Sequence, residues 1–360
     1  MPKILITGAG SVQSNGVINS LLRNPANKEE LIGTGSDPMD LALCKAHKKY
    51  LVPYSTSPGY REALLKVLER ERPDMIHFQH DLELFEAMRF RGEIASRGVK
   101  MFIPDNEVID TCVYKHKSWL KFKAAGVPVP QNLMIHDEAD LKRAFAELKD
   151  EDGRIWLRSI SIGAGGKGSF PASNFESASE WIEKNQGWGD FAAAQMLTPD
   201  SITWLSIWHE GELIVAQTRR RRGWAHASRS ISGITGVTKV GETCSSPQVD
   251  EIALSAIKAV TPRPHGIFGV DMTFDKKGIP NPTEINISRF FATILFFTEA
   301  GLNMPEMLKD ICLYKKFPRL EKKLNPLKDG LLWLRGMDSY PRLTTADELD
   351  REIIRLGGAT

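Results

Sequence analysis

The sequence predicts a mixed α/β and α+β chain, in which a parallel sheet precedes regions built from antiparallel strands and helices. The first observation is that short apolar strands alternate with helices over roughly the first 105 residues, which is typical of a doubly wound parallel sheet. The second is that later strands follow one another directly, and one pair forms a hairpin. The length of 360 residues suits two or three packed subdomains.

The alternating region begins with an apolar strand that runs directly into a glycine-containing turn. Gly8 and Gly10 suggest a dinucleotide-binding turn, but Gln13 stands where the full motif has a third glycine. A tight strand-to-helix turn without a nucleotide is therefore the alternative. Ligands of such sheets bind at the carboxyl ends of the strands. The strands expected here are Lys3–Ile6, Glu30–Gly35, Asp74–Phe78 and Val99–Ile103, and the helices are Ser11–Arg23, Tyr60–Arg70 and Asp81–Arg97.

The rest of the chain contains both helices and strands. Several of these strands are separated by too few residues to hold a crossover helix, which indicates antiparallel pairing. A long polar loop is expected over Gly223–Gly241. The expected helices are Val113–Ala125, Asp137–Leu148, Ser177–Lys184, Val249–Val260 and one that starts at Thr345. The expected strands are Arg154–Ile160, Phe191–Leu197, Trp204–Trp208, Glu212–Thr218, Gly266–Phe274, Ile279–Ile287 and Gly330–Arg335.

The charges nearly cancel, because 47 Lys and Arg residues face 45 Asp and Glu residues. This balance argues against a protein that binds nucleic acid through its net charge. The longest apolar stretch, near residues 290–297, is too short to span a membrane. The four cysteines show no metal-ligand spacing, and a strand that begins at Lys3 leaves no room for a signal peptide. We therefore expect a cytoplasmic protein that binds neither nucleic acid nor membrane.

The hairpin within Gly266–Arg289 carries the most specific signal. Glu284 and Asn286 are two residues apart on one strand and point to the same face, and pairing can bring Asp271 of the preceding strand beside them. Two carboxylates and an amide oxygen suit Mg²⁺, which keeps water and phosphate oxygens as its other ligands. The alternative is a polar strand face that meets solvent.

Arg158 ends a strand and precedes a loop rich in glycine. Backbone N–H groups of such a loop can close over phosphate oxygens, while a guanidinium group can bind two of them. The order of residues is not that of a Walker A loop, and a flexible surface loop is the alternative. The candidates for phosphate binding in this loop are Gly163, Gly165, Gly166, Lys167 and Gly168.

Four consecutive arginines, Arg219–Arg222, follow the strand that is expected to end at Thr218. Because side chains alternate along a strand, only two of the four can share a face. A solvated patch or a contact with nucleic acid is one interpretation. The other interpretation is that these arginines bind an anionic substrate or a γ-phosphate. The nearly neutral net charge and the lack of interleaved aromatic residues favour this second interpretation.

Together, these segments resemble the ATP-grasp superfamily, and in particular its carboxylate–amine ligases related to the large subunit of carbamoyl-phosphate synthase. The resemblance runs from Lys3 to about Asp310 and rests mainly on the Glu284-Ile285-Asn286 hairpin and the glycine-rich loop. It implies a Rossmann-like pre-ATP-grasp domain over residues 1–110, followed by an ATP-grasp fold that clamps ATP between two subdomains. These would cover residues 111–200, with the phosphate loop, and 201–313, with the metal site, before an extension over 314–360.

The resemblance also implies a role for each candidate residue. The nucleotide would be bound by the loop glycines and Lys167, and by Lys115, Arg158, Gln195, Met196, Leu197 and Asp200. Mg²⁺, or Mn²⁺ in its place, would be bound by Asp271, Glu284 and Asn286. The substrate carboxylate or its acyl phosphate would be bound by Arg219, Arg221 and Arg289.

Three positions depart from the family pattern. Gln195 stands where the adenine-binding strand usually has Glu, and Ile202 falls near the place of the ribose-binding Glu. Arg289 follows Asn286 by three residues instead of two. The first two departures favour an alternative in which the chain is a non-catalytic or regulatory ATP-binding protein on the same fold.

The implied activity is an ADP-forming ligation that activates a small-molecule carboxylate as an acyl phosphate and joins it to an amine or a similar nucleophile. A homodimer is the base-rate expectation for such a protein. An NAD(P)-dependent oxidoreductase is a weaker alternative, because Gln13 breaks the glycine motif and Tyr114-Lys115 lacks the Tyr-x-x-x-Lys spacing. Biotin-dependent carboxylation also uses this fold, and the residues alone do not separate it from ligation.

Overall fold

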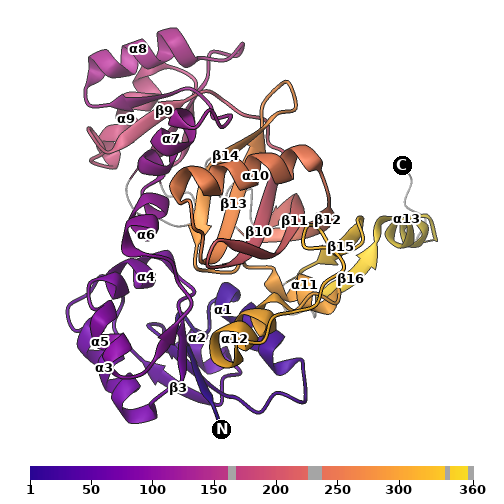
Figure 1. Cartoon of the computed structure of the whole chain (residues 1–360). Coiled ribbons are helices and arrows are strands. Elements are labelled where there is room, and N and C mark those ends of the chain that lie inside the picture. Colours follow the sequence, from indigo (N-terminus) through magenta and orange to yellow (C-terminus); the bar gives the residue numbers. More distant parts are fainter. Residues whose placement is uncertain (161–167, 226–236, 337–340, 356–360) are drawn as a thin grey trace.

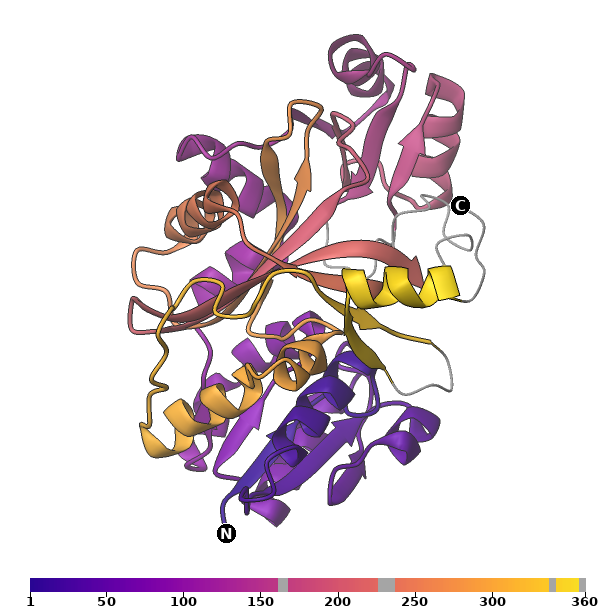
Figure 2. The same ribbon diagram turned by 90° about the vertical axis from the view of Figure 1, so that its right-hand side faces the viewer.

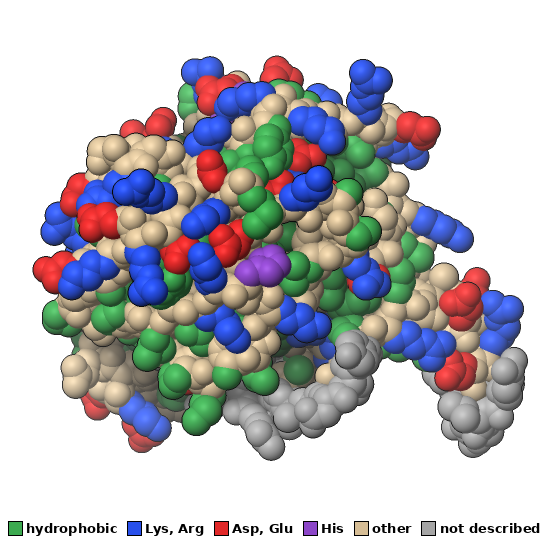
Figure 3. Space-filling model, turned by 90° about the horizontal axis from the view of Figure 1, so that it is seen from below, with side chains coloured by type: hydrophobic (Ala, Val, Ile, Leu, Met, Phe, Trp, Pro, Cys, Tyr) green, Lys and Arg blue, Asp and Glu red, His purple; other side chains and the backbone are tan. Residues whose placement is uncertain are grey.

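Three sheets follow one another along the chain in the computed structural model, which describes residues 1–160, 168–225, 237–336 and 341–355. Figures 1 and 2 place the first sheet at the N-terminal end of the molecule and the second at the opposite end. The third and largest sheet lies between them. None of the helices in these ranges is long and apolar enough to cross a membrane. Acidic and basic side chains are interspersed over the face seen from below (Figure 3).

The first sheet is parallel and has the strand order β3-β2-β1-β4-β5. Its central strand, β1, is apolar and buried because helices cover both faces of a doubly wound sheet. The strands are β1 (Lys3–Ile6), β2 (Glu30–Gly35), β3 (Lys48–Leu51), β4 (Met75–His77) and β5 (Lys100–Met101). The helices are α1 (Val12–Leu22), α2 (Pro38–Leu43), α3 (Tyr60–Glu71), α4 (Asp81–Met88) and α5 (Arg91–Ser96).

The parallel sheet is confirmed, with two differences from the expected elements. The helix expected over Asp81–Arg97 is divided into α4 and α5, and the short elements α2 and β3 were not expected. β3 is a polar edge strand, so it lacks the apolar signal of a buried strand. The turn after β1 requires glycine at position 10, where φ is +97° and a Cβ atom would lie 2.3 Å from the carbonyl carbon of Asp40.

The second sheet is antiparallel, with the order β6-β9-β7-β8, and two helices cover it. Its buried residues form a separate core that includes Leu141, Leu157 and Ile182. The strands are β6 (Asn132–Ile135), β7 (Ile155–Ser159), β8 (Phe170–Ala172) and β9 (Phe191–Ala194), and the helices are α8 (Glu138–Leu148) and α9 (Phe175–Lys184). The chain reaches this sheet through α6 (Asn106–Val113) and α7 (Lys115–Ala124), where one helix was expected.

The third sheet is antiparallel throughout, with the order β14-β13-β10-β11-β12-β15-β16. Its strands are β10 (Ser201–His209), β11 (Glu212–Ala225), β12 (Val237–Cys244), β13 (Gly266–Phe274), β14 (Pro280–Ile287), β15 (Leu331–Leu334) and β16 (Arg342–Thr345). The helices that accompany it are α10 (Pro247–Val260), α11 (Ile294–Glu299), α12 (Met304–Tyr314) and α13 (Ala346–Arg355).

The long loop expected over Gly223–Gly241 is corrected at both of its ends, while residues 226–236 lie outside the described residues. β11 continues through the four arginines to Ala225, and β12 begins at Val237. The expected end of the strand at Thr218 was therefore wrong, because a run of charges was treated as a strand terminus. Arg219–Arg221 pair with Ser201–Thr203 of β10 on one side and with Gly241–Thr243 of β12 on the other, so the charged residues belong to a central strand.

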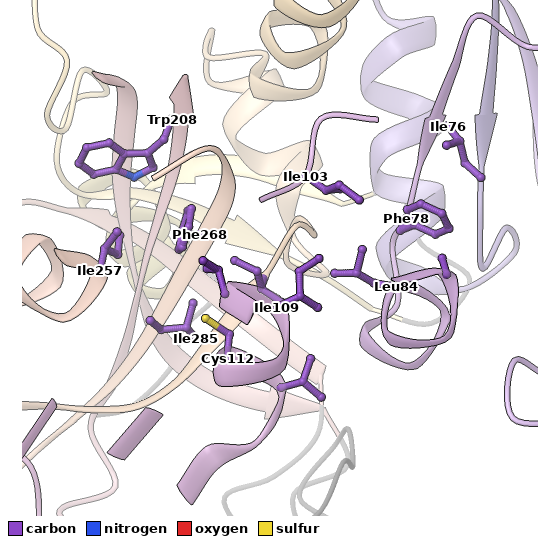
Figure 4. Close-up of a cluster of buried hydrophobic side chains, with 14 of the residues drawn as sticks. Ile76, Phe78, Leu84, Ile103, Ile109, Cys112, Trp208, Ile257, Phe268 and Ile285 are labelled. Atoms are coloured by element: carbon purple, nitrogen blue, oxygen red, sulfur yellow. The ribbon is translucent and has the colours of Figure 1, made fainter. Parts of the chain in front are cut away.

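One hydrophobic cluster joins the first sheet to the third. Figure 4 shows Ile109 and Cys112 of α6 between Leu84 of α4 and Ile285 of β14. The same cluster continues to Phe268 on β13. At about 25 cal/mol for each Å² of apolar surface removed from water, such a continuous cluster resists separation of the two regions. The carboxyl end of β4 is thereby held close to the β13–β14 hairpin.

A buried carboxyl group lies beneath the first strand-to-helix turn. Glu83 of α4 is 8% exposed, and the hydroxyl of Tyr60 donates to its Oε1 at 3.4 Å. Burial raises the pKa of Glu83 to about 7, although hydrogen bonds from Thr7, Tyr60 and the N–H of Gly8 act in the opposite direction. The folded protein therefore keeps this carboxyl protonated at pH values where the unfolded chain ionises it.

The raised pKa of Glu83 predicts that stability is lost as the pH rises. The pKa of about 7 in the folded protein exceeds the ordinary value of 4.5. The contribution of protonated Glu83 to the free energy of unfolding is therefore fully present below pH 4.5 and disappears as the pH rises through 7. Glu83→Gln removes this loss of stability and should be more stable than the wild type at pH 8, by about 3 kcal/mol. Thermal melts between pH 4.5 and 8 measure the difference. The exposed Glu62→Gln is the control, and a parallel pH dependence in both variants would contradict the assignment.

Candidate functional site

A cavity of about 370 Å³ is lined by residues from all three sheets. The first sheet contributes Asp81 beyond the end of β4, and the second contributes Arg158 near the end of β7. The third sheet contributes the residues that face the cavity from β10, β11, β13 and β14. The predicted site residues that line it are Lys115, Arg158, Gln195, Met196, Leu197, Arg219, Arg221, Asp271, Glu284, Asn286 and Arg289.

The β13–β14 hairpin places the two predicted metal-binding carboxylates side by side. Asp271 pairs directly with Glu284 across the ladder, and Gly269 pairs with Asn286 two positions away. Cross-strand partners on one face have Cβ atoms about 4.5–5.5 Å apart, so both carboxylates reach the same point in the cavity. The register shifts immediately after Asp271, and such bulges commonly redirect a side chain beside a functional site.

A chain of hydrogen bonds holds these groups in place. The hydroxyl of Thr203 donates to Oδ1 of Asp271, and the amide nitrogen of Asn286 donates to Oδ2 at 3.0 Å. Arg289 donates to the amide oxygen of Asn286 and, through its Nε at 2.7 Å, to Asp81. The amide oxygen predicted to be a metal ligand therefore faces Arg289, which would have to move before Asn286 could bind an ion.

Glu284 is surrounded by cationic groups. Its carboxylate lies 3.3 Å from Nζ of Lys115, which is the first residue of α7. Removal from bulk water would raise the pKa of Glu284, but the charges of Lys115, Arg289 and Arg158 outweigh it and hold the pKa below its ordinary value. The carboxylate is therefore ionised at neutral pH and available to a cation.

Arg158 brings a partly unsatisfied guanidinium group into the cavity. Its Nη1 donates to the carbonyl oxygen of Thr283 at 3.1 Å, and its buried Nε has no partner among the described residues. Burial lowers the pKa of Arg158, and Glu284 partly offsets this effect. An anion that accepted from the free N–H would satisfy the group, because a buried donor without a partner costs about 1–3 kcal/mol.

The arginine run divides between the two faces of β11, as alternation requires. Arg219 and Arg221 line the cavity, Arg220 is exposed, and Arg222 forms a bidentate ion pair with Glu242. The expectation that two of the four arginines share one functional face is consistent with this geometry. The guanidinium of Arg221 lies 3.8 Å from the ring centroid of Trp224, which also lines the cavity.

Arg219 is the more deeply buried member of this pair. It is 2% exposed and donates to the hydroxyls of Thr203, Thr238 and Thr293 at 2.7–3.0 Å. Burial and the neighbouring charge of Arg221 lower its pKa to about 9, although Asp271 has the opposite effect. Its Nε lacks a partner among the described residues, so this face of β11 presents concentrated, incompletely compensated positive charge.

The segment after β9 forms part of the cavity wall. Gln195, Met196 and Leu197 line the cavity, and the side chain of Gln195 is hydrogen-bonded to Gln131. Apolar side chains beside backbone polar groups suit a nucleobase. The aromatic and aliphatic side chains that line the cavity include Trp119, Phe122, Trp156, Met196, Leu197, Met272 and Ile285.

The residues near the expected ribose-binding position do not lie as the sequence predicted. Asp200, predicted to contact the nucleotide, is exposed and is not among the residues that line the cavity. Ile202 belongs to the hydrophobic core, because alternation along β10 turns its side chain away from the site. Ser201 and Thr203 occupy the cavity face of this strand, and they were missed because the family pattern directed attention to carboxylates.

The glycine-rich loop lies mainly outside the described residues, which applies to Gly163, Gly165, Gly166 and Lys167. Its last glycine, Gly168, has φ of +78°, a conformation that other residues rarely adopt. Ser169, which follows, lines the cavity. The loop therefore enters the cavity wall at its C-terminal end.

Sequence reasoning also missed Asp81 as a member of the site. Its carboxylate is the ion-pair partner of Arg289, and the two side chains are 22% and 17% exposed. The available signal was its position, since Asp81 follows the carboxyl end of β4, where ligands of parallel sheets bind. The contact with Arg289 depends on packing between the first and third sheets and has no counterpart in the local sequence.

The donor set fits a divalent cation and a polyanion. Asp271 and Glu284 supply hard oxygen ligands, the type that Mg²⁺ and Mn²⁺ prefer. Five cationic side chains face the cavity, against three carboxylates including Asp81. The Nε groups of Arg158 and Arg219, which have no partner within the described part of the chain, are donors suited to phosphate or carboxylate oxygens.

Comparison with solved structures finds the same architecture in ATP-bound enzymes. A carboxyaminoimidazole ribonucleotide synthase from Aspergillus clavatus, complexed with ATP, has a TM-score of 0.69 at 15% identity, over 92% of this chain and 81% of that chain. A biotin carboxylase from Campylobacter jejuni has a TM-score of 0.69 at 18% identity, with coverages of 92% and 75%. The chain has the ATP-grasp fold.

A third structure shares this ATP-grasp fold over nearly the whole chain. An L-amino acid ligase from Bacillus licheniformis has a TM-score of 0.64 at 12% identity and covers 98% of this chain and 85% of its own. No protein-family model and no curated protein sequence matches the chain. At such identities the likeness establishes the fold alone, and the closer resemblance to carbamoyl-phosphate synthase stays a prediction.

The geometry predicts that Asp81 and Arg289 stabilise each other across the sheet boundary. A double-mutant cycle with Asp81→Asn and Arg289→Gln should give a coupling energy of about 1–2 kcal/mol, because the pair is largely shielded from solvent. The exposed pair Arg61–Glu93, with side chains 57% and 40% exposed, is the control and should couple by less than about 0.5 kcal/mol. Urea unfolding measures the coupling energy in both cycles. A coupling energy for Asp81–Arg289 no larger than that for Arg61–Glu93 would contradict the prediction.

Proposed function

We propose that the chain is an ATP-dependent, ADP-forming ligase that activates a small-molecule carboxylate as an acyl phosphate and joins it to an amine or a similar nucleophile. The observation that carries the proposal is the pairing of Asp271 with Glu284 in a cavity that also holds five cationic side chains. The named activity of the Bacillus licheniformis structure, L-amino acid ligation, and the ATP complex of the Aspergillus clavatus enzyme support it. A cytoplasmic homodimer is the form that we propose.

The nucleotide would lie across the cavity with its base against the apolar side chains that follow β9. Met196 and Leu197 would contact the adenine, and Ser201 would face the sugar in place of the carboxylate expected there. Lys115 and Arg158 would bind phosphate oxygens, and the glycine-rich segment that ends at Gly168 would cover them. The orphan Nε of Arg158 would gain a partner in this arrangement.

Asp271 and Glu284 would hold Mg²⁺, with Asn286 as a third ligand after Arg289 moves toward an anion. Bound Mg²⁺ would neutralise phosphate charge and orient the terminal phosphoryl group for transfer. In its absence, Lys115 and Arg289 supply the positive charge near these carboxylates. When the nucleotide binds with its ion, the carboxylates would pair with Mg²⁺ and the cationic side chains would pair with phosphate oxygens. Positive and negative charges in the cavity would therefore stay balanced.

Arg219 and Arg221 would bind the substrate carboxylate and hold it in line with the terminal phosphate. Little covalent chemistry is required of the protein, because positioning and charge neutralisation account for most catalysis of phosphoryl transfer. Arg289 would stabilise the acyl phosphate, from which the amine displaces phosphate. Exclusion of water protects that intermediate from hydrolysis.

A non-catalytic ATP-binding role is the second candidate. Gln195, which replaces the usual carboxylate, is hydrogen-bonded to Gln131 and leaves the adenine contact to backbone groups. Such a protein would bind the nucleotide without turning it over. An NAD(P)-dependent oxidoreductase is disfavoured, because Gln13 stands where the dinucleotide-binding motif has its third glycine.

Glu284→Gln should reduce the rate of ADP formation by more than about 100-fold, because it removes one of the two charged oxygen ligands of the metal ion. The measurement is ADP release from MgATP across amino and hydroxy acids paired with amines. Glu251→Gln, an exposed change on α10, is the control and should keep full activity. Retained activity in Glu284→Gln would eliminate the metal assignment. Thermal stabilisation by MgATP without phosphate release from any substrate pair would favour the regulatory alternative.

Arg221→Met should raise the KM for the carboxylate by about 10–100-fold with a smaller effect on the KM for ATP, because a charged hydrogen bond contributes about 1.5–3 kcal/mol. Arg220→Met is the matched control, since Arg220 lies next to Arg221 on β11 but is exposed on the opposite face. Steady-state kinetics with each substrate varied in turn separates the two effects. Equal changes in both variants would contradict the assignment.

A further inference from the structure

Two histidines and a glutamate meet at the end of the large sheet that is remote from the nucleotide cavity. His209 is the last residue of β10, Glu210 begins the turn into β11, and His265 immediately precedes β13. One ligand atom from each of the three residues lies within 4.8 Å of the other two. Thr203 lines the cavity six residues earlier on the same strand, so the cluster is roughly 20 Å from it at about 3.3 Å per residue.

The backbone holds these three residues in a defined arrangement. Trp208 pairs with Gly266 at the end of the β10–β13 ladder, so His209 and His265 stand opposite each other one step further on. The turn that carries Glu210 is fixed by positive φ values, 52° at Glu210 and 94° at Gly211. The arrangement therefore comes from strand register and a tight turn rather than from a mobile loop.

Aromatic packing fixes the orientation of both imidazole rings. Phe102, which follows β5 of the first sheet, lies 4.5 Å from the His265 ring and 6.1 Å from the His209 ring, measured between centroids. Phe317, beyond α12, meets the His209 ring edge-on at 5.1 Å. Ligand rings that are already oriented lose little conformational freedom when they bind an ion.

The closest polar contacts in the cluster join His265 to Glu210. Nδ1 of His265 lies 3.4 Å from the backbone N–H of Glu210, which donates to it, and 3.1 Å from Oε1 of the same residue. This N–H contact is long, and an ion between Nδ1 and Oε1 would take the single lone pair of Nδ1 in its place. Two ligands at about 2.0–2.2 Å from one ion are separated by roughly 3 Å, so a shared ion would satisfy both atoms.

The ion pairs of Glu210 leave one of its two carboxylate oxygens directed at the cluster. Arg263 pairs with Oε2 of Glu210, which leaves Oε1 for the site.

We propose that His209, Glu210 and His265 form a binding site for a Zn²⁺-type transition-metal ion, distinct from the nucleotide cavity. Two imidazoles and one carboxylate are a donor set that Zn²⁺ prefers and that Mg²⁺ does not. The Glu210 side chain is 47% exposed, so water can reach the ion and complete its coordination. Because Phe102 and Phe317 pack on the ligand rings, the ion would stabilise the junction of the first sheet, the third sheet and the segment after α12.

The test is calorimetric titration of the full chain with ZnCl₂ after treatment with a chelator, in buffer with excess Mg²⁺ to occupy the carboxylate pair in the cavity. One Zn²⁺ should bind per chain, and saturation should raise the thermal midpoint by about 3–6 °C. His209→Gln and His265→Gln should each weaken Zn²⁺ binding at least tenfold and remove the thermal shift. His136→Gln, which changes an exposed histidine directly after β6, is the control and should bind Zn²⁺ like the wild type.

Glu210→Gln provides a variant that leaves both imidazoles in place and should also weaken binding. Circular dichroism and the thermal shift caused by MgATP verify that each variant is folded, and neither measurement depends on turnover. The absence of stoichiometric Zn²⁺ binding by the wild type, or equal affinity in the three ligand variants and in His136→Gln, would overturn the proposal. Both results would leave the proposed ligase activity unaffected, since its test uses the opposite end of β10.

Discussion

The balance of charge around Glu284 is the constraint on which the cavity depends. A carboxylate removed from bulk water is costly, and this one stays ionised because Lys115, Arg289 and Arg158 are close to it. Each cation comes from a different part of the chain: the start of α7, the segment after β14 and the end of β7. The cations in turn need the carboxylates, because isolated buried guanidinium groups would be equally unfavourable.

This mutual dependence requires the three sheets to be held together. The hydrophobic cluster that runs from Phe78 through Ile109 and Cys112 to Ile285 supplies the attachment (Figure 4). It brings the carboxyl end of β4 to the β13–β14 hairpin, so that Asp81 can pair with Arg289. Packing of apolar surface thus determines the position of polar groups that could not be held there by their own interactions.

The two ends of β10 illustrate how one strand can serve separate purposes. Its first residues, Ser201 and Thr203, line the cavity, and its last, His209, belongs to the histidine–glutamate cluster. The intervening residues alternate between two hydrophobic clusters, with Trp204 in one and Leu205 in the other. One strand of the large sheet therefore connects the proposed nucleotide site to the junction where Phe102 and Phe317 pack.

The sequence alone determined what depends on local pattern. Alternation of strands and helices predicted the parallel sheet, and the spacing of Glu284 and Asn286 predicted that both lie on one face of a strand. Alternation also predicted that two of the four arginines share a face, which holds for Arg219 and Arg221. These properties follow from backbone geometry, which repeats every two residues in a strand and every 3.6 in a helix.

Only the tertiary structure decided which distant residues meet. The pairing of Asp81 with Arg289 spans 208 positions, and the contact of Lys115 with Glu284 depends on how α7 packs against β14. The exclusion of Ile202 from the cavity and the presence of Ser201 there were likewise decided by the register of β10 within its sheet. Such contacts arise from the burial of apolar surface, which is not directional, so local sequence carries no record of them.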